Sequence, residues 1–118
     1  MKTPKVLWVD PDHLWAWITT INLLRERYGF KITTLDIFLR KVIIHNCKDK
    51  DVVIIHSGTL TPHPQLKSIL EEIKQVYPSI KVGLETNSVI GSVQHLIDFY
   101  IHKLIPVREI AELIKYYI

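Results

Sequence analysis

The chain has 118 residues, a formal net charge of +3 and 47% hydrophobic residues. This length suits one domain with its own core, and the composition excludes a disordered chain. The basic residues are scattered rather than clustered, which argues against a nucleic-acid partner for this domain. No apolar run approaches the ~18 residues that a membrane span needs. We therefore expect a single domain over residues 1–118 without membrane contact.

The one cysteine, Cys47, cannot form an internal disulfide, which suits a reducing cytoplasm. Its place near an expected helix end indicates a partly exposed structural thiol rather than a nucleophile. We accordingly expect a cytoplasmic protein.

Strand and helix patterns alternate along the whole chain. Strands are expected where apolar and β-branched residues gather, over residues 5–9, 31–35, 51–55, 80–84 and 99–104. Helices are expected over residues 13–28, from 36 to about 47, from 61 to 76, over 88–97 and from 106 onward. Asp12 and Asp36 suit the N-caps of the first two helices, and Gly29 suits the position just after the first.

This alternation predicts an α/β fold. Strands joined through helices give right-handed crossovers and a parallel sheet that helices cover on both faces. Five such units predict a three-layer α/β/α, doubly wound sheet of the flavodoxin type, with strand order 2-1-3-4-5. Functional crevices in such folds lie beyond the carboxyl ends of the strands. The residues expected at that edge are Asp10, Asp12, His56, Ser57, Thr86, Asn87 and Lys103.

The ends of the first and third strands resemble those of CheY-like receiver domains of two-component response regulators, and the likeness extends over the full chain. In that family an acidic pair after the first strand holds Mg²⁺. Asp10 matches the first acid, and Pro11 replaces the second. The third strand of the family ends in the aspartate that accepts the phosphoryl group, and His56 stands in that place.

The fourth and fifth strands extend this resemblance. Thr86 matches the serine or threonine that ends the family's fourth strand. Tyr100 and Lys103 match the aromatic residue of the fifth strand and the lysine three positions later. A proline normally stands four positions after the acceptor, whereas this chain has Leu60 there and Pro62 two residues later.

These replacements remove what phosphotransfer requires, namely a carboxylate nucleophile and a divalent cation. The resemblance therefore implies a phosphorylation-independent pseudo-receiver, a protein-interaction module in signal transduction or regulation. We expect no enzymatic activity and no cofactor or bound metal. We expect His56 to be hydrogen-bonded to polar neighbours, and Lys103 can pair with Asp10. The residues of this degenerate phosphoacceptor pocket are Asp10, Asp12, His56, Thr86 and Lys103.

Other functions remain open for the same crevice. His56 could itself accept a phosphoryl group, although its metal ligands are missing. Asp10, Asp12, His13 and His56 could hold zinc, but a hydrogen-bonded polar cluster is the simpler expectation. The crevice could bind a small molecule or nucleotide, although no glycine-rich phosphate loop follows the first strand. A hydrolase built on His56 and Ser57 is disfavoured, because adjacent side chains of a strand point in opposite directions.

Two aromatic residues are candidates for a surface that binds a protein partner. Trp17 lies on the apolar stripe of the first helix, whereas Trp15 lies on its polar side, where it can anchor a partner or cover a loop. Tyr100 can belong to a switch surface or simply pack at the sheet edge. Residues 116–118 leave apolar side chains exposed however the last helix turns, which indicates a homodimer or a missing continuation.

Overall fold

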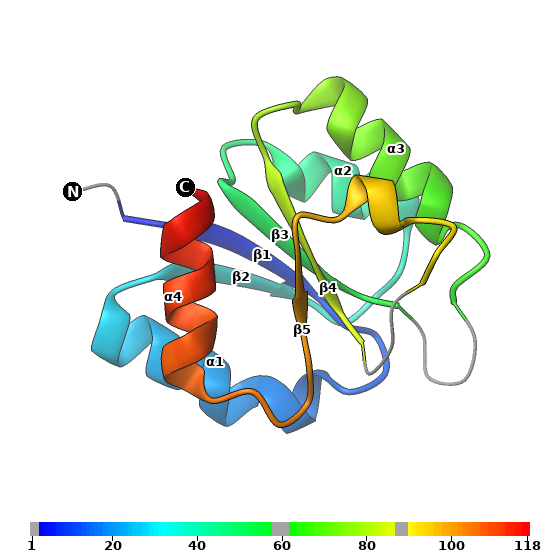
Figure 1. The fold of residues 1–118 in the computed structure, drawn as a ribbon. Coiled ribbons are helices and arrows are strands. Elements are labelled where there is room, and N and C mark those ends of the chain that lie inside the picture. Colours follow the sequence, from blue (N-terminus) through cyan, green and yellow to red (C-terminus); the bar gives the residue numbers. More distant parts are fainter. Residues whose placement is uncertain (1–2, 58–61, 87–89) are drawn as a thin grey trace.

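The structure is a computed structural model that describes residues 3–57, 62–86 and 90–118 (Figure 1). Within these residues, five parallel strands form one sheet in the order β2-β1-β3-β4-β5. The strands are β1 (Lys5–Val9), β2 (Lys31–Leu35), β3 (Val52–His56), β4 (Lys81–Glu85) and β5 (Phe99–Ile101). The helices are α1 (Leu14–Tyr28), α2 (Arg40–Cys47), α3 (Leu66–Val76), α4 (Val107–Tyr117) and the 3₁₀-helix η1 (Gln94–Leu96).

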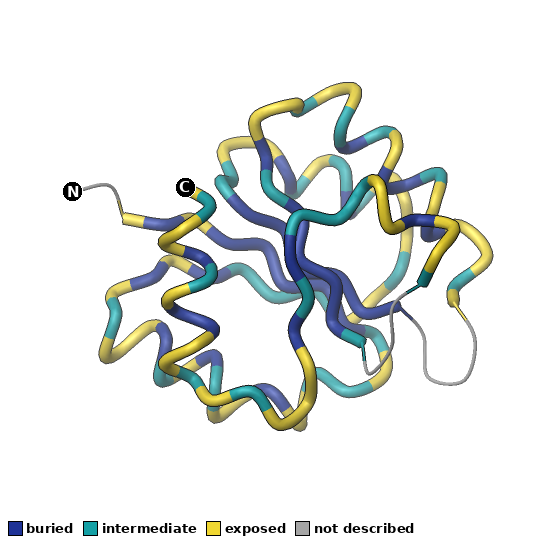
Figure 2. Tube along the Cα trace, in the orientation of Figure 1, coloured by how far each residue is buried: buried dark blue, intermediate teal, exposed yellow. Residues whose placement is uncertain are grey.

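Helices cover both faces of the sheet, as the sequence predicts for a doubly wound fold. Helices α1 and α4 lie on one face, and α2, α3 and η1 lie on the other. Every residue of the central strand β3 is buried, because helices pack on both of its sides (Figure 2). None of the helices in the described ranges is long and apolar enough to cross a membrane. The predicted α/β class and strand order are confirmed.

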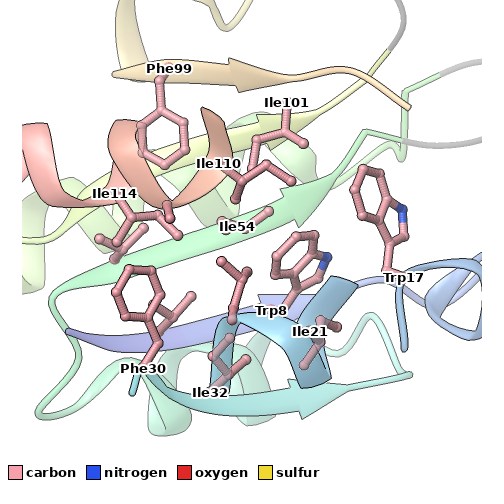
Figure 3. Close-up of a cluster of buried hydrophobic side chains, with 14 residues drawn as sticks. Trp8, Trp17, Ile21, Phe30, Ile32, Ile54, Phe99, Ile101, Ile110 and Ile114 are labelled. Carbon is pink, nitrogen blue, oxygen red and sulfur yellow. The ribbon is translucent and has the colours of Figure 1, made fainter. Parts of the chain in front are cut away.

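The sheet face under α1 and α4 carries the aromatic part of the core. Trp8 and Trp17 pack with ring centroids 5.2 Å apart, and Figure 3 shows both beside the aliphatic side chains of the strands. Phe99 lies over Gly83 of the neighbouring strand, where a Cβ atom would come within 2.5 Å of its ring. Trp17 therefore belongs to the core, as its place on the apolar stripe predicts.

The opposite face buries Cys47 at the end of α2. Cys47 has no exposed surface and packs among the aliphatic residues of this second core. Burial raises the pKa of its thiol to about 12, with a smaller opposing effect from Lys50. The expectation of a partly exposed thiol is wrong, because the last turn of α2 presses Cys47 onto the sheet.

Several helices begin later than the sequence predicts. The N-cap residue of α1 is His13 rather than Asp12, and it makes no side-chain capping bond. Asp10 instead accepts the backbone N–H groups of Asp12 and His13 in the turn just before the helix. Helix α2 begins at Arg40 instead of residue 36, because Phe38 is drawn into the second core in an extended segment. Of the expected helix over 88–97, one 3₁₀ turn is present among the described residues, and α3 begins at 66 rather than 61.

One expected helix end and one expected strand end can also be compared. Gly29 follows α1 in the left-handed conformation (φ 71°), and its N–H bonds back to Arg25, as expected of a C-terminal glycine. Strand β5 ends at Ile101 rather than at residue 104. Leu60 and Asn87, which were expected near the site, and Thr61, the expected start of the third helix, lie outside the described residues.

Candidate functional site

The buried polar residues of the described chain gather at one edge of the sheet. Asp10 follows β1, His56 and Glu85 end β3 and β4, and Ser57 follows His56. His56 and Glu85 are direct neighbours in the β3–β4 register. Because carboxyl ends of parallel strands meet at one edge, chain segments far apart in sequence form one site here. We name the carboxyl-edge cluster after its six members: Asp10, Asp12, His13, His56, His63 and Glu85.

Asp10 shapes the loop that begins α1. Its Oδ1 accepts hydrogen bonds from the backbone N–H of Asp12 (2.9 Å) and of His13 (2.7 Å). These bonds satisfy donors at a helix start that has no capping bond from His13 itself. They also bring Asp12 and His13 over the edge of the sheet. The second oxygen of Asp10, Oδ2, is buried and has no hydrogen-bond partner among the described residues.

Glu85 connects the cluster to the hydrophobic core. Its Oε1 accepts a hydrogen bond of 2.9 Å from the indole Nε1–H of Trp8. Its Oε2 lies 3.0 Å from Nδ1 of His56. Only 4% of Glu85 is exposed, so its carboxyl group is surrounded mainly by protein, including these two neighbours. Glu85 therefore fixes the position of His56 from below.

His56 lies between acidic groups on both sides. Its Nε2 is 3.3 Å from Oδ2 of Asp12, and His63 approaches the same oxygen with its Nε2 at 3.6 Å. Both ring nitrogens of His56 are buried, yet neither meets the geometry of a hydrogen bond with a described residue. The contacts are thus electrostatic in character. His56 therefore has the polar neighbours expected of it, Glu85 at 3.0 Å and Asp12 at 3.3 Å.

The pKa values of Glu85 and His56 are both raised. Burial raises the pKa of Glu85 from 4.5 to about 7; His56 and Trp8 oppose this effect, and neighbouring Asp10 adds to it. Burial by itself would lower the pKa of His56, but the contact with Glu85 and the charges of Asp10, Glu85 and Asp12 raise it above 6.5. Both groups therefore hold protons more tightly than they do in water.

Two members of the cluster were missed by sequence reasoning. Glu85 was overlooked because the apolar run of the fourth strand stops at residue 84, which hid its last position. The signal was an acid directly after a buried run, two residues beyond Gly83 on the same face of the strand. His63 comes from the segment before α3, and its ring stacks on Phe38 at 4.2 Å. Nothing in the local sequence predicts that pairing.

Of two further residues expected in the pocket, Lys103 lies away from the cluster, whereas Thr86 directly follows its member Glu85. Lys103 is exposed in the turn after β5, and it forms no ion pair with Asp10 among the described contacts. The reason is that β5 ends two residues earlier, so the chain has turned away before it reaches Lys103. Thr86 is half-buried after β4, and its backbone N–H donates to the carbonyl of Ile101 (3.0 Å).

The candidate partner surfaces are partly as expected. Trp15 is 76% exposed on α1, in agreement with its place on the polar side of the helix. Tyr100 is half-buried against the second core, and its hydroxyl is buried without a hydrogen-bond partner among described residues. At the C-terminus, Tyr116 and Ile118 are exposed, whereas Tyr117 stacks on Phe99.

Solved structures provide the comparison with known proteins, because no family model and no curated protein match the sequence. A response-regulator receiver domain from Clostridium thermocellum is similar at a TM-score of 0.71 with 21% identity, covering 97% of this chain and 93% of that chain. A response regulator from Thermotoga maritima reaches 0.74 with 19% identity and covers 98% of both chains. The chemotaxis protein CheY4 of Vibrio cholerae reaches 0.74 with 12% identity, covering 99% of this chain and 100% of that one. The chain therefore has the fold of CheY-like receiver domains.

Proposed function

We propose that the chain is a phosphorylation-independent pseudo-receiver that acts as a protein-interaction module in signal transduction or regulation. The observation that carries this proposal is the environment of His56. It ends β3, the place of the acceptor aspartate in receivers, and it lies 3.0 Å from Glu85 and 3.3 Å from Asp12. An imidazole enclosed by carboxylates takes the place of a carboxylate that would receive phosphate.

Charge supports the proposal. A phosphoryl group brings about −1.5 to −2 charges at neutral pH. Here it would meet the carboxyl groups of Asp10, Asp12 and Glu85. In residues 3–57, 62–86 and 90–118, no lysine or arginine forms an ion pair with any of these three. Because Lys103 is exposed after β5, the cluster offers a phosphoryl group repulsion rather than a cationic partner.

The proposed function is protein binding, and α1 offers a surface for it. Trp15 (76% exposed) and Ile18 (43% exposed) are three residues apart, so they are neighbours on the surface of α1. Exposed tryptophan is a frequent anchor of protein interfaces. We propose that a protein partner, either a signalling protein or a second copy of this chain, contacts this surface. A non-enzymatic role in the cytoplasm completes the proposal.

Amide NMR with Mg²⁺ and beryllofluoride, a mimic of the phosphoryl group, tests the phosphorylation claim. We expect no saturable shifts at His56, Thr86 or Tyr100. The DrrB receiver domain, whose structure is described as activated by beryllofluoride, serves as the positive control. Saturable shifts at these residues of this chain, comparable to those of the control, would overturn the proposal.

The interaction claim has a separate test. The wild-type chain is used to capture a binding protein, and the affinity of that protein is then measured for Trp15→Ala. We expect weaker binding by at least about tenfold, as hot-spot residues show. Leu104→Ala is the matched control, since Leu104 is 91% exposed but lies in the turn before α4. Equal affinity of the wild type and Trp15→Ala would remove α1 from the interface.

A further inference from the structure

Polar atoms without partners gather at the carboxyl-edge cluster. They are Oδ2 of Asp10, Nε2 of His56 and Nε2 of His63, and none has a hydrogen-bond partner among the described residues. Nδ1 of His56 instead lies 3.0 Å from Oε2 of Glu85. Asp10 is completely buried and His56 is 7% exposed. Buried polar groups are nearly always satisfied, so several orphans in one place point to a missing binding partner.

Three side chains of the cluster hold possible metal-ligand atoms close together, and two of them, Asp10 and His56, carry partnerless atoms. Asp10, His13 and His56 each offer one ligand atom, and these atoms lie within 4.8 Å of one another. Oδ2 of Asp12 is 3.3 Å from Nε2 of His56. Two ligands of one tetrahedral ion are roughly 3.3 Å apart when each bond is about 2.0 to 2.1 Å. The Asp12–His56 pair already has this separation. The ligand atoms of Asp10 and His13, which lie within 4.8 Å of that of His56, have to move closer when the ion binds.

The donor set does not fit Mg²⁺, the ion that the receiver fold implies. Mg²⁺ requires near-octahedral oxygen ligands, whereas imidazole nitrogens of His13 and His56 face this space. Pro11 offers no side-chain oxygen where receivers have a second acid. Imidazole combined with carboxylate suits Zn²⁺ and related transition metals instead.

The surroundings of His56 support a metal ligand rather than a structural histidine. A proton on Nδ1 faces the carboxylate of Glu85 at 3.0 Å, which leaves the electron pair of Nε2 available. Trp8 in turn orients Glu85 through its indole N–H. Metal-binding histidines commonly have such a carboxylate behind them, which fixes the tautomer and the ring orientation.

We propose that Asp10, Asp12, His13 and His56 bind one divalent transition-metal ion of the zinc class. The ion occupies the place between β1, β3 and the start of α1. Its charge balances the two aspartates, which have no lysine or arginine partner within the described residues. Nε2 of His63 remains 3.6 Å from Oδ2 of Asp12, so His63 orients that ligand from outside. A bound ion would offset the carboxylate charge that the proposed function invokes, so that function then rests on the histidine that stands in the place of the acceptor aspartate.

Titration of the chelator-treated chain with Co²⁺ tests the site. We expect one equivalent to produce the intense visible absorption of four-coordinate Co²⁺, which Zn²⁺ abolishes and a large excess of Mg²⁺ leaves unchanged. No thiolate-to-metal band should appear, because Cys47 is buried in the opposite core. The affinity should fall more than about a hundredfold in His13→Ala and roughly 10- to 100-fold in Glu85→Gln.

His95→Ala is the control, since His95 is an exposed histidine of η1 outside the cluster. Its affinity should stay within roughly twofold of the wild type. His13 is only half-buried, so His13→Ala should keep the fold even where a change at His56 does not, and an amide NMR spectrum checks this. Failure of Co²⁺ to saturate, or equal losses in His13→Ala and His95→Ala, would overturn the metal site. Neither result bears on the beryllofluoride experiment.

Discussion

Trp8 of β1 and Glu85 of β4 are joined by a hydrogen bond of 2.9 Å although 77 residues separate them in the chain. Strand β3 lies between β1 and β4, so this bond crosses over the strand that carries His56. The second oxygen of Glu85 contacts His56 at 3.0 Å. One buried carboxyl group is thus shared between an aromatic core residue and the candidate site.

Replacing Trp8 by phenylalanine should cost more than its lost apolar contacts. The buried Glu85 carboxyl loses its indole donor, and a lost hydrogen bond to such a group costs about 1.5 to 3 kcal/mol. We expect urea unfolding of Trp8→Phe to give a free energy of unfolding lower by at least this amount. Trp17→Phe is the control, because Trp17 shares the same core without contact to Glu85. Similar losses in both variants would show that the hydrogen bond contributes little.

The free energy of unfolding should fall as pH rises from about 5 to about 8. The pKa of Glu85 is raised to about 7, mainly by burial, and the pKa of His56 is raised above 6.5, because Glu85, Asp10 and Asp12 outweigh burial. A group with a higher pKa when folded binds more protons in the folded state, so stability is present at low pH and is lost as the group deprotonates. We expect a loss of roughly 1 to 3 kcal/mol.

Urea unfolding at a series of pH values measures this dependence. Glu85→Gln removes one titrating group and should flatten the curve. Glu112→Gln should not, because Glu112 is an exposed residue of α4 that pairs with Arg108. A stability that rises or stays constant between about pH 5 and 8 in the wild type would contradict the assigned pKa directions.

Gly83→Ala should destabilise the fold through a direct clash. A Cβ atom at Gly83 would lie 2.5 Å from the ring of Phe99 on the paired strand. The ring cannot easily retreat, because it stacks on Tyr117 of α4 with centroids 5.3 Å apart. Overpacking of this kind costs about 1 to 3 kcal/mol, measured by thermal or urea unfolding.

Gly91→Ala provides the matched comparison for that clash. No atom of the described residues lies within 4 Å of a Cβ placed at Gly91, so the change in stability should stay below about 0.5 kcal/mol. Adding Phe99→Leu to Gly83→Ala should recover part of the loss, since a smaller side chain leaves room for the methyl group. A fully stable Gly83→Ala single variant would show that the Phe99 ring moves freely.

Tyr100→Phe should leave the chain as stable as before or more stable by up to about 1 kcal/mol. The hydroxyl of Tyr100 is buried and lacks a hydrogen-bond partner among the described residues, so its removal ends a desolvation cost. Tyr116→Phe, at an exposed tyrosine, should have no effect. A loss of more than about 1 kcal/mol in Tyr100→Phe would show that the hydroxyl is hydrogen-bonded in solution.

The architecture could be predicted from the sequence because its central strands are buried on both faces. Such strands appear as continuous apolar runs, and β1 and β3 have this pattern. Helix starts were predicted less well, since tertiary contacts decide them. His13 replaces Asp12 as the N-cap residue of α1, and packing of Phe38 delays the start of α2.

The sequence predicts where in the fold the candidate site lies, but it does not predict all of the residues that form it. Parallel strand ends meet at one edge, which brings Asp10 and His56 together as expected. Glu85 was missed because only the β3–β4 register reveals that it faces His56. Lys103 was expected in the site because the fifth strand was predicted to extend to residue 104, whereas β5 ends at Ile101. The roles assigned to Asp10, Asp12 and His56 stay predictions.

The buried thiol of Cys47 at the end of α2 can be used to detect local opening of the protein. With a pKa near 12 and no exposed surface, Cys47 should resist alkylating reagents for as long as the second core stays closed. The rate at which Cys47 is alkylated then measures how often α2 separates from the sheet. Because the chain has no other cysteine, a probe thiol introduced on α1 would be labelled alone, and partner docking could be followed there without background.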